Sequence, residues 1–197
     1  MEADWEVEVG GGAPVIEALW PGFVDLRRNP ERLAEIAEAV NFPALADLLR
    51  TLNSARSPMW TAKCDFWETE PAELASTESG KLAADPSTAL ACYVDLLPVE
   101  GQVFVQWTQA EGFCRQWVAR LEELSLPGCR VDLIVRQAIA GEAEGFGITA
   151  YVGSTGRDRS GAAEALSAAL ADFAGAIPTW SGPATAATKL QWKSTGE

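Results

Sequence analysis

Histidine is absent from this 197-residue chain. Because imidazole is the usual general base near neutral pH, its absence excludes Ser-His and Cys-His nucleophile pairs, and it also excludes histidine metal ligands. Without histidine, only a carboxylate or thiol of shifted pKa could titrate between about pH 5.5 and 8. Such a group would itself indicate a functional site.

Closely spaced cysteines are also lacking. The four cysteines have none of the Cys-x-x-Cys pairs that are typical of zinc and redox sites, and they stand at Cys64, Cys92, Cys114 and Cys129. Each lies in a segment patterned like a core element, so we expect reduced, buried thiols, no metal and no cofactor. If one thiol is reactive, we expect it to be Cys64, because the adjacent Lys63 would favour the thiolate.

Long apolar runs are missing as well, since none approaches the ~18 residues that a membrane span needs. Residues 1–9 alternate acidic and apolar side chains and lack the basic and apolar regions of a secretory signal. These features predict a cytoplasmic protein without membrane association.

Basic residues are scarce, with 15 lysines and arginines against 28 acidic residues and a net charge of −13. Residues 1–100 carry a net charge of −11 and residues 101–197 only −2. An acidic surface repels phosphate backbones and anionic lipids, so we expect neither nucleic acid nor membrane as a partner. A basic protein remains a possible partner.

Six segments alternate apolar and polar side chains in the manner of β-strands, namely residues 5–9, 59–67, 90–97, 102–107, 130–139 and 146–152. In the second segment the alternation predicts that Trp60, Ala62, Cys64 and Phe66 share the core face. In the fourth it predicts that Val103, Val105 and Trp107 do so. Residues 189–193 could add a short edge strand.

Helical spacing follows in four places. Asn29-Pro30 is a good helix start and precedes a stripe over residues 33–40, which Pro43 should break. Further apolar stripes cover residues 45–52, 113–124 and 166–177. The acidic stretch 68–88 has weak periodicity and predicts an exposed connection with one helical turn at most.

The order of these elements predicts an α+β fold, a mostly antiparallel sheet with helices on one face and ferredoxin-like βαββαβ elements. One globular domain over residues 1–197 is expected. It could contain two similar halves, an acidic βαββ half over 1–100 and a βαββα half over 101–197 that could end in an edge strand.

One candidate ligand site is the loop over residues 153–161. Its small residues follow a strand and open a helix, where Arg157, Arg159 and Ser160 could hold an anion. The loop is no P-loop, because alanines replace the phosphate-binding lysine and the metal-binding hydroxyl. The simpler interpretation is an ordinary turn in which Ser160 or Asp158 caps the helix.

A second candidate is the sheet face opposite the core. Alternation places polar and aromatic side chains there, at Lys63, Asp65, Trp67, Tyr93, Asp95, Gln102, Gln106, Asp132, Arg136, Thr149 and Tyr151. Such a face could bind a small ligand, although a solvated face with cross-strand ion pairs explains the same pattern. Asp65, Asp95 and Asp132 could share a cation, but neutralisation by Lys63 and Arg136 accounts for them without a metal.

We expect no catalytic residue. The favoured hypothesis is a non-catalytic, acidic interaction protein of the adaptor, inhibitor or immunity type that binds a basic protein. Glu68, Glu70 and Glu73, in the exposed acidic stretch, and Trp20, in an irregular segment, are the candidate contact residues. The alternative is a small-molecule binding module, or a histidine-independent enzyme, that uses the sheet face or the 153–161 loop.

Overall fold

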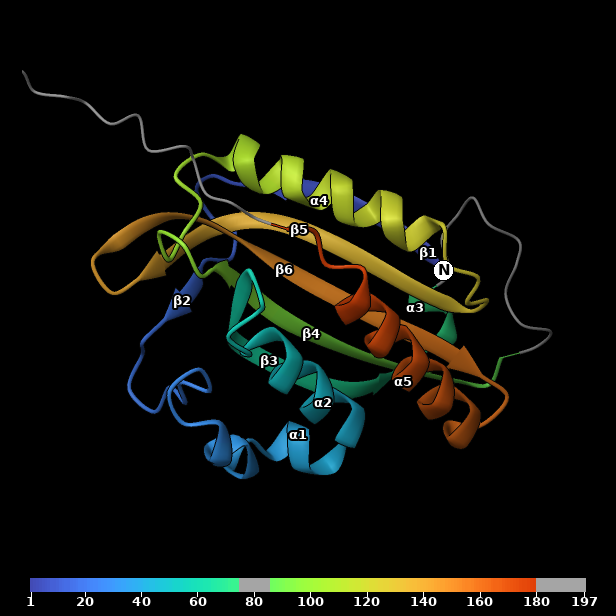
Figure 1. Cartoon of the computed structure of the whole chain (residues 1–197). Helices are drawn as coiled ribbons and strands as arrows, with labels where there is room; N and C mark the ends of the chain where they lie inside the picture. Colours follow the sequence, from blue (N-terminus) through green and yellow to red (C-terminus); the bar gives the residue numbers. More distant parts are fainter. Residues whose placement is uncertain (75–85, 180–197) are drawn as a thin grey trace, which may run out of the picture.

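A computed structural model describes residues 1–74 and 86–179 of the chain (Figure 1). The elements are β1 (Glu2–Glu8), β2 (Ile16–Ala18), the 3-10 helix η1 (Pro30–Glu35), α1 (Ala37–Asn41), α2 (Pro43–Leu52), β3 (Met59–Thr69), α3 (Pro71–Leu74), β4 (Thr88–Pro98), α4 (Trp107–Glu122), β5 (Cys129–Ala140), β6 (Ala143–Gly156) and α5 (Arg159–Gly175). This confirms the predicted α+β class. The edge strand predicted at 189–193 lies outside the described residues.

A single six-stranded sheet contains strands from both halves of the chain. Its order is β1-β5-β6-β4-β3, and β2 pairs with β5 beyond the end of β1. β1 and β2 run parallel to β5, while the other neighbours are antiparallel. β4, α4 and β5 form a split β-α-β unit, with β6 between its two parallel strands. The ferredoxin-like order and the two similar halves stay predictions.

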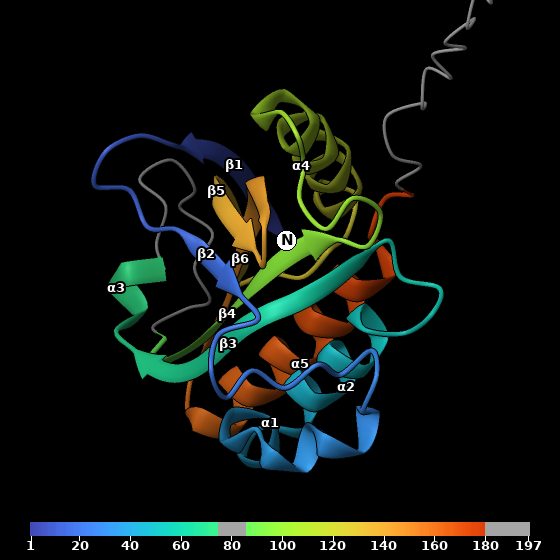
Figure 2. The ribbon, with the colours of Figure 1, turned by 90° about the vertical axis from the view of Figure 1, so that its left-hand side faces the viewer.

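Three helices, α2, α4 and α5, cover one face of this sheet, and α3 lies on the other side (Figure 2). The main core fills the space between helices and sheet and contains three of the predicted stripes, including Leu45, Leu49, Phe113, Leu166 and Phe173. The stripe predicted over 33–40 is only partly buried, because the chain is extended at Ile36, between η1 and α1, and Val40 is exposed. A smaller apolar group covers one end of the opposite face and contains Ile16, Ala18, Trp60, Ala62, Leu97, Val103, Ala138 and Ala140. Across the described ranges, no helix is long and apolar enough to cross a membrane.

Proline sets the helix boundaries between residues 30 and 43. Pro30 begins η1, α1 ends at Asn41, and Pro43 is the first residue of α2. A proline at the first helical position needs no hydrogen bond from its nitrogen, so it starts a helix readily and cannot continue the one before it. The predicted break at Pro43 is therefore confirmed.

The strand predicted at 102–107 is wrong. Phe104 forms only an isolated bridge to Phe146, while Val105 is exposed and Trp107 already belongs to α4. The cause lies at the start of this segment, where Gly101 and Gln102 have φ angles of 80° and 63°. These left-handed conformations turn the chain and prevent it from extending as a strand.

A β-bulge interrupts β3. The register shifts between Thr61 and Cys64, so that Ala62 and Lys63 together oppose the single residue Asp95 of β4. An extra residue of this kind reverses the alternation of side chains along the rest of the strand.

The bulge makes the predicted facing of β3 wrong. Trp60 and Ala62 belong to the smaller apolar group, whereas Cys64 and Phe66 pack against the main core on the other face. The sequence predicted all four on one face because alternation alone assumes an uninterrupted strand.

Trp117 tests the packing of α4 on the sheet. Its side chain is fully buried, it stacks on Phe173 at 4.2 Å between ring centroids, and its indole N–H donates to the Phe173 carbonyl at 3.1 Å. We expect Trp117→Ala to cost roughly 3–5 kcal/mol in the free energy of unfolding, measured by denaturant titration. Glu122→Ala and Glu123→Ala change exposed positions and should each cost less than about 0.5 kcal/mol. Equal losses for all three variants would contradict the packing described.

Candidate functional site

The predicted 153–161 loop is mostly strand and helix. β6 continues to Gly156, and Ser154 and Thr155 are buried. Asp158 caps α5 by accepting a hydrogen bond of 2.8 Å from the Gly161 N–H. This confirms the simpler interpretation of a capped turn, since the cap occupies a backbone donor that an anion would need. Arg157, Arg159 and Ser160 are exposed in this turn, and Arg159 lies 3.4 Å from Glu68.

The sheet face opposite the helices gathers most of the second candidate set. Strand register places nine of the predicted side chains on this face, namely Lys63, Asp65, Trp67, Tyr93, Asp95, Asp132, Arg136, Thr149 and Tyr151. Gln102 and Gln106 do not join them, because the segment before α4 is no strand, and Gln106 is the N-cap residue of α4.

Hydrogen bonds link four strands across this face. Arg136 donates through Nε and Nη2 to Glu8 at 3.0 and 2.8 Å, and through Nη1 to the Thr149 hydroxyl at 3.3 Å. Thr149 in turn donates to Asp95 at 2.6 Å. Glu8 lies on β1, Arg136 on β5, Thr149 on β6 and Asp95 on β4. The network therefore connects the edge strand β1, through β5 and β6, with β4.

Asp95 is a buried carboxyl at the end of this network, with only 7% of its surface exposed. Burial raises its pKa, although the Thr149 hydrogen bond and the charges of Arg136 and Lys63 oppose the shift. A buried carboxyl of raised pKa is a candidate site residue.

Three aromatic rings lie beside the network. Trp67, Tyr93 and Tyr151 have ring centroids 5.8–6.4 Å apart, and the Arg136 guanidinium lies 5.8 Å from the Tyr151 ring. Burial, together with the nearby Asp95 and Asp65, raises the pKa of Tyr93 to about 12, so its hydroxyl stays protonated at neutral pH. The cluster offers flat apolar surfaces next to hydrogen-bonding groups.

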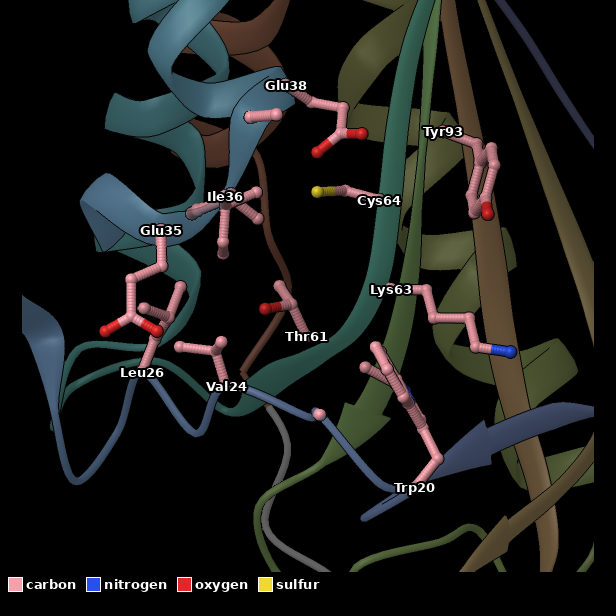
Figure 3. Close-up of a pocket in the computed structure, with 14 residues that line it drawn as sticks. Trp20, Val24, Leu26, Glu35, Ile36, Glu38, Thr61, Lys63, Cys64 and Tyr93 are labelled. Carbon is pink, nitrogen blue, oxygen red and sulfur yellow. The ribbon is translucent and has the colours of Figure 1, made fainter. Parts of the chain in front are cut away.

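A cavity of about 480 Å³ adjoins the face at the outer edge of β3 (Figure 3). One wall is the bulged part of β3, residues 61–64; the others come from residues 20–26 and 35–38, with Leu49 and Tyr93. Lys63 and Tyr93 border both the cavity and the sheet face, so the two regions form one continuous candidate site.

Trp60 holds the loop wall of the cavity against the sheet. The Phe23 ring meets the Trp60 ring edge-on at 5.9 Å, and the Arg27 guanidinium lies 3.8 Å from its centroid. Arg27 is fixed in turn by two hydrogen bonds of 2.9 Å to Asp25. Cation–π and aromatic contacts of this kind each contribute about 0.5–2 kcal/mol. They position the loop that carries Trp20.

Cys64 faces the helix layer at the cavity, on the other side of β3 from Lys63 (Figure 3). Burial raises its pKa to about 12, and the Glu38 carboxylate adds to the shift. The expectation that Lys63 would activate this thiol is therefore wrong, because the two side chains point to opposite faces. In the part of the chain that the structure describes, no group of three or more Cys, Asp or Glu side chains could hold a metal ion.

The predicted partner-binding residues are divided between two places. Glu68, Glu70 and Glu73 are exposed at the end of β3 and in α3, where Glu68 lies near Arg159 and Glu73 accepts a hydrogen bond from Thr69. Trp20 is half-buried in the cavity wall, and its indole N–H is buried without a hydrogen-bond partner among the described residues.

The sequence analysis missed the cavity, because residues from separate segments form its walls. One signal was available: the sequence predicts no helix or strand between residues 9 and 29, a stretch of more than about 15 residues. Connections of this length without regular structure are uncommon in compact domains and often belong to binding sites. Trp20, a large apolar residue in such a connection, was the residue that indicated a binding site there.

Comparison with known proteins gives no relative, since no family model, curated protein or solved structure matches this chain. A function for this protein is therefore inferred from its residues and their geometry.

Asp95→Asn tests the buried carboxyl. Because its pKa is raised on folding, the folded state keeps a proton that the unfolded state releases, so stability falls as pH rises through the window above the usual value of about 3.9. Asparagine stays neutral and can still accept from Thr149. We expect the variant to match the wild type near pH 4 and to be more stable at pH 8, measured by urea unfolding.

Asp65→Asn is the matched control, since Asp65 is an exposed aspartate on the same face. It should keep the pH dependence of the wild type. A loss of stability at pH 8 for Asp95→Asn would show instead that the charged carboxylate stabilises the network.

Proposed function

We propose that this protein is a non-catalytic binding module for a small molecule, held in the cavity beside the outer edge of β3. The cavity itself carries this proposal. It has the volume of a small-molecule site, and apolar side chains line it together with a few polar groups, as such sites usually do. The hydrogen-bonded network of Arg136, Thr149 and Asp95 lies on the sheet face that adjoins the cavity.

The chemistry of the nearby groups favours binding over catalysis. The Cys64 thiol has a raised pKa, so it is a poor nucleophile at neutral pH. Asp95 is hydrogen-bonded within the network and buried, which suits a structural role at the border of a site. The free thiols of the chain, three of them buried, also fit the cytoplasmic location that we propose with this function.

Blocking the cavity tests the proposal. Ala37 lies exposed on α1 at the cavity wall, so Ala37→Trp should fill the space without disturbing the core. A panel of amino acids, short peptides, carboxylic acids and amines is screened by the rise in melting temperature, since a ligand at 100 times its Kd stabilises by about 2.7 kcal/mol. We expect a hit that loses at least about tenfold in affinity with Ala37→Trp.

Ala171→Trp is the control, because Ala171 is exposed on α5 and does not line the cavity. It should bind the same hit as tightly as the wild type. If every hit is indifferent to Ala37→Trp, the cavity is not the binding site. Native mass spectrometry of the freshly purified protein provides a second measurement, because a retained small molecule adds to the mass of the chain.

Binding of a basic protein is a second proposal, supported by the exposure of Glu68, Glu70 and Glu73 on a chain of net charge −13. Charge complementarity of this kind mainly accelerates association. Trp20 does not join this surface in our proposal, because it lines the cavity.

Reversing Glu68, Glu70 and Glu73 to lysine should slow association with a basic partner recovered by affinity capture. The loss should shrink as salt rises, because attraction is screened over ~8 Å at physiological ionic strength. The same reversal at the exposed Glu122, Glu123 and Glu142 is the control and should have the smaller effect. An association rate that ignores both the reversal and the salt would refute this second proposal.

A further inference from the structure

Two side chains of opposite charge border the cavity without an ion pair or a side-chain hydrogen bond among the described residues. Glu38 on α1 and Lys63 on β3 are half-buried, and within residues 1–74 and 86–179 neither forms an ion pair or a side-chain hydrogen bond. Glu35, on the same wall, differs because it is exposed and accepts two hydrogen bonds from Arg32 at 2.9 and 2.7 Å. Partly buried charges without partners are costly, and a charged ligand relieves that cost.

The two charges lie on opposite sides of the β3 edge. Figure 3 shows Glu38 beside Cys64, on the helix side of the strand, whereas Lys63 extends past Trp20 and Tyr93 toward the open face. The proximity of Glu38 to Cys64 and of Lys63 to Asp95 agrees with this view, because each charge acts on the pKa of its neighbour. A ligand that meets both must carry its own two charges well apart.

The strand edge between the two charges suits a peptide group. β3 is the last strand of the sheet, and four consecutive residues, 61–64, line the cavity. An edge strand carries backbone donors and acceptors that no neighbouring strand uses, and an extended peptide unit matches them. The Thr61 N–H points to this outer edge, where it is bonded to Asn53 at 3.2 Å, so a peptide would meet the edge of β3 beyond this residue, along the bulge.

The remaining walls are apolar. Val24, Leu26 and Ile36 face the cavity from the loop and from the start of α1 (Figure 3). They would bury an aliphatic side chain, at about 25 cal/mol for each Å² of apolar surface removed from water.

Resting on the proposed binding function, we propose that the ligand is a short peptide with free ends. Its ammonium group pairs with Glu38, its carboxylate pairs with Lys63, and its apolar side chains lie against Val24 and Ile36. A single amino acid fits less well, because its ammonium and carboxylate groups are attached to the same carbon and cannot lie far apart. No covalent step is involved.

The experiment titrates the whole chain with Leu-Leu and tri-alanine by isothermal titration calorimetry. Free leucine, N-acetyl-Leu-Leu and Leu-Leu-amide are titrated beside them. We expect the free peptides to bind, and acetylation or amidation each to weaken binding at least about tenfold. A tenfold change corresponds to 1.4 kcal/mol. These ligand changes use the wild-type protein, so the result does not depend on the folding of a variant.

Glu38→Gln and Lys63→Met assign each charge to its partner. Glu38→Gln should weaken the free peptide about as much as acetylation does and should not weaken the acetylated peptide further. Lys63→Met should behave in the same way toward the amide. Glu31→Gln is the matched control, because Glu31 is an exposed glutamate on the adjacent η1 and does not line the cavity. It should leave binding unchanged.

The outcomes separate this inference from the function on which it rests. If another member of the panel binds and loses affinity with Ala37→Trp while peptides do not bind, the binding function stands and the peptide assignment is wrong. Equal affinity for leucine and Leu-Leu, or peptide binding that ignores Glu38→Gln and Lys63→Met, also overturns the assignment. If no compound depends on the cavity, both proposals fail.

Discussion

The extra residue in β3 determines how the whole candidate site is arranged. Before it, Trp60 and Ala62 face the small apolar group; after it, Cys64 and Phe66 face the helix layer. The change of face places Lys63 next to Asp95, at the border of the open sheet face, and lets the strand edge bend beside the loop that carries Trp20. Bulges strengthen the local twist and re-aim side chains, and they are common next to binding sites. A regular strand here would have no such junction between sheet face and cavity.

Close packing at two places on the open face frames the polar network that lies between them. On β6 the positions facing this side include Gly147 and Gly153, with Thr149 and Tyr151 between them. A Cβ atom at Gly147 would lie 2.7 Å from Leu97, and one at Gly153 would lie 2.6 Å from Leu74. The two glycines thus allow Leu97 and Leu74 to pack closely on the sheet, and the polar network lies between these two contacts.

Much of the fold could be predicted from the sequence. Five of the six predicted strands are present, and the stripes that contain Leu49, Trp117 and Leu166 are buried, because periodicity reports directly on which side chains leave water. The exception is residues 102–107, where positive φ angles at Gly101 and Gln102 prevent a strand although the side chains alternate. Alternation has no information on backbone dihedral angles.

The site was less accessible to sequence reasoning. Alternation correctly placed Tyr93, Arg136 and Tyr151 on one polar face, because each strand after the bulge keeps its period of two. The cavity could not be inferred in this way, since its existence depends on how the 20–26 loop packs against Trp60. Contacts between segments so far apart in the chain leave no local pattern.

The alternation of glycine and larger residues along β6 also bears on how such a protein could diversify. A side chain at Gly147 would collide with Leu97 and one at Gly153 with Leu74, so substitutions there disturb the scaffold. Thr149, between them, is buried and hydrogen-bonded to Asp95, whereas Tyr151 is half-buried and keeps part of its ring at the surface of the face. Substitutions at Tyr151 would therefore change what the face recognises, while substitutions at Thr149 and at the two glycines would disturb the frame that holds it.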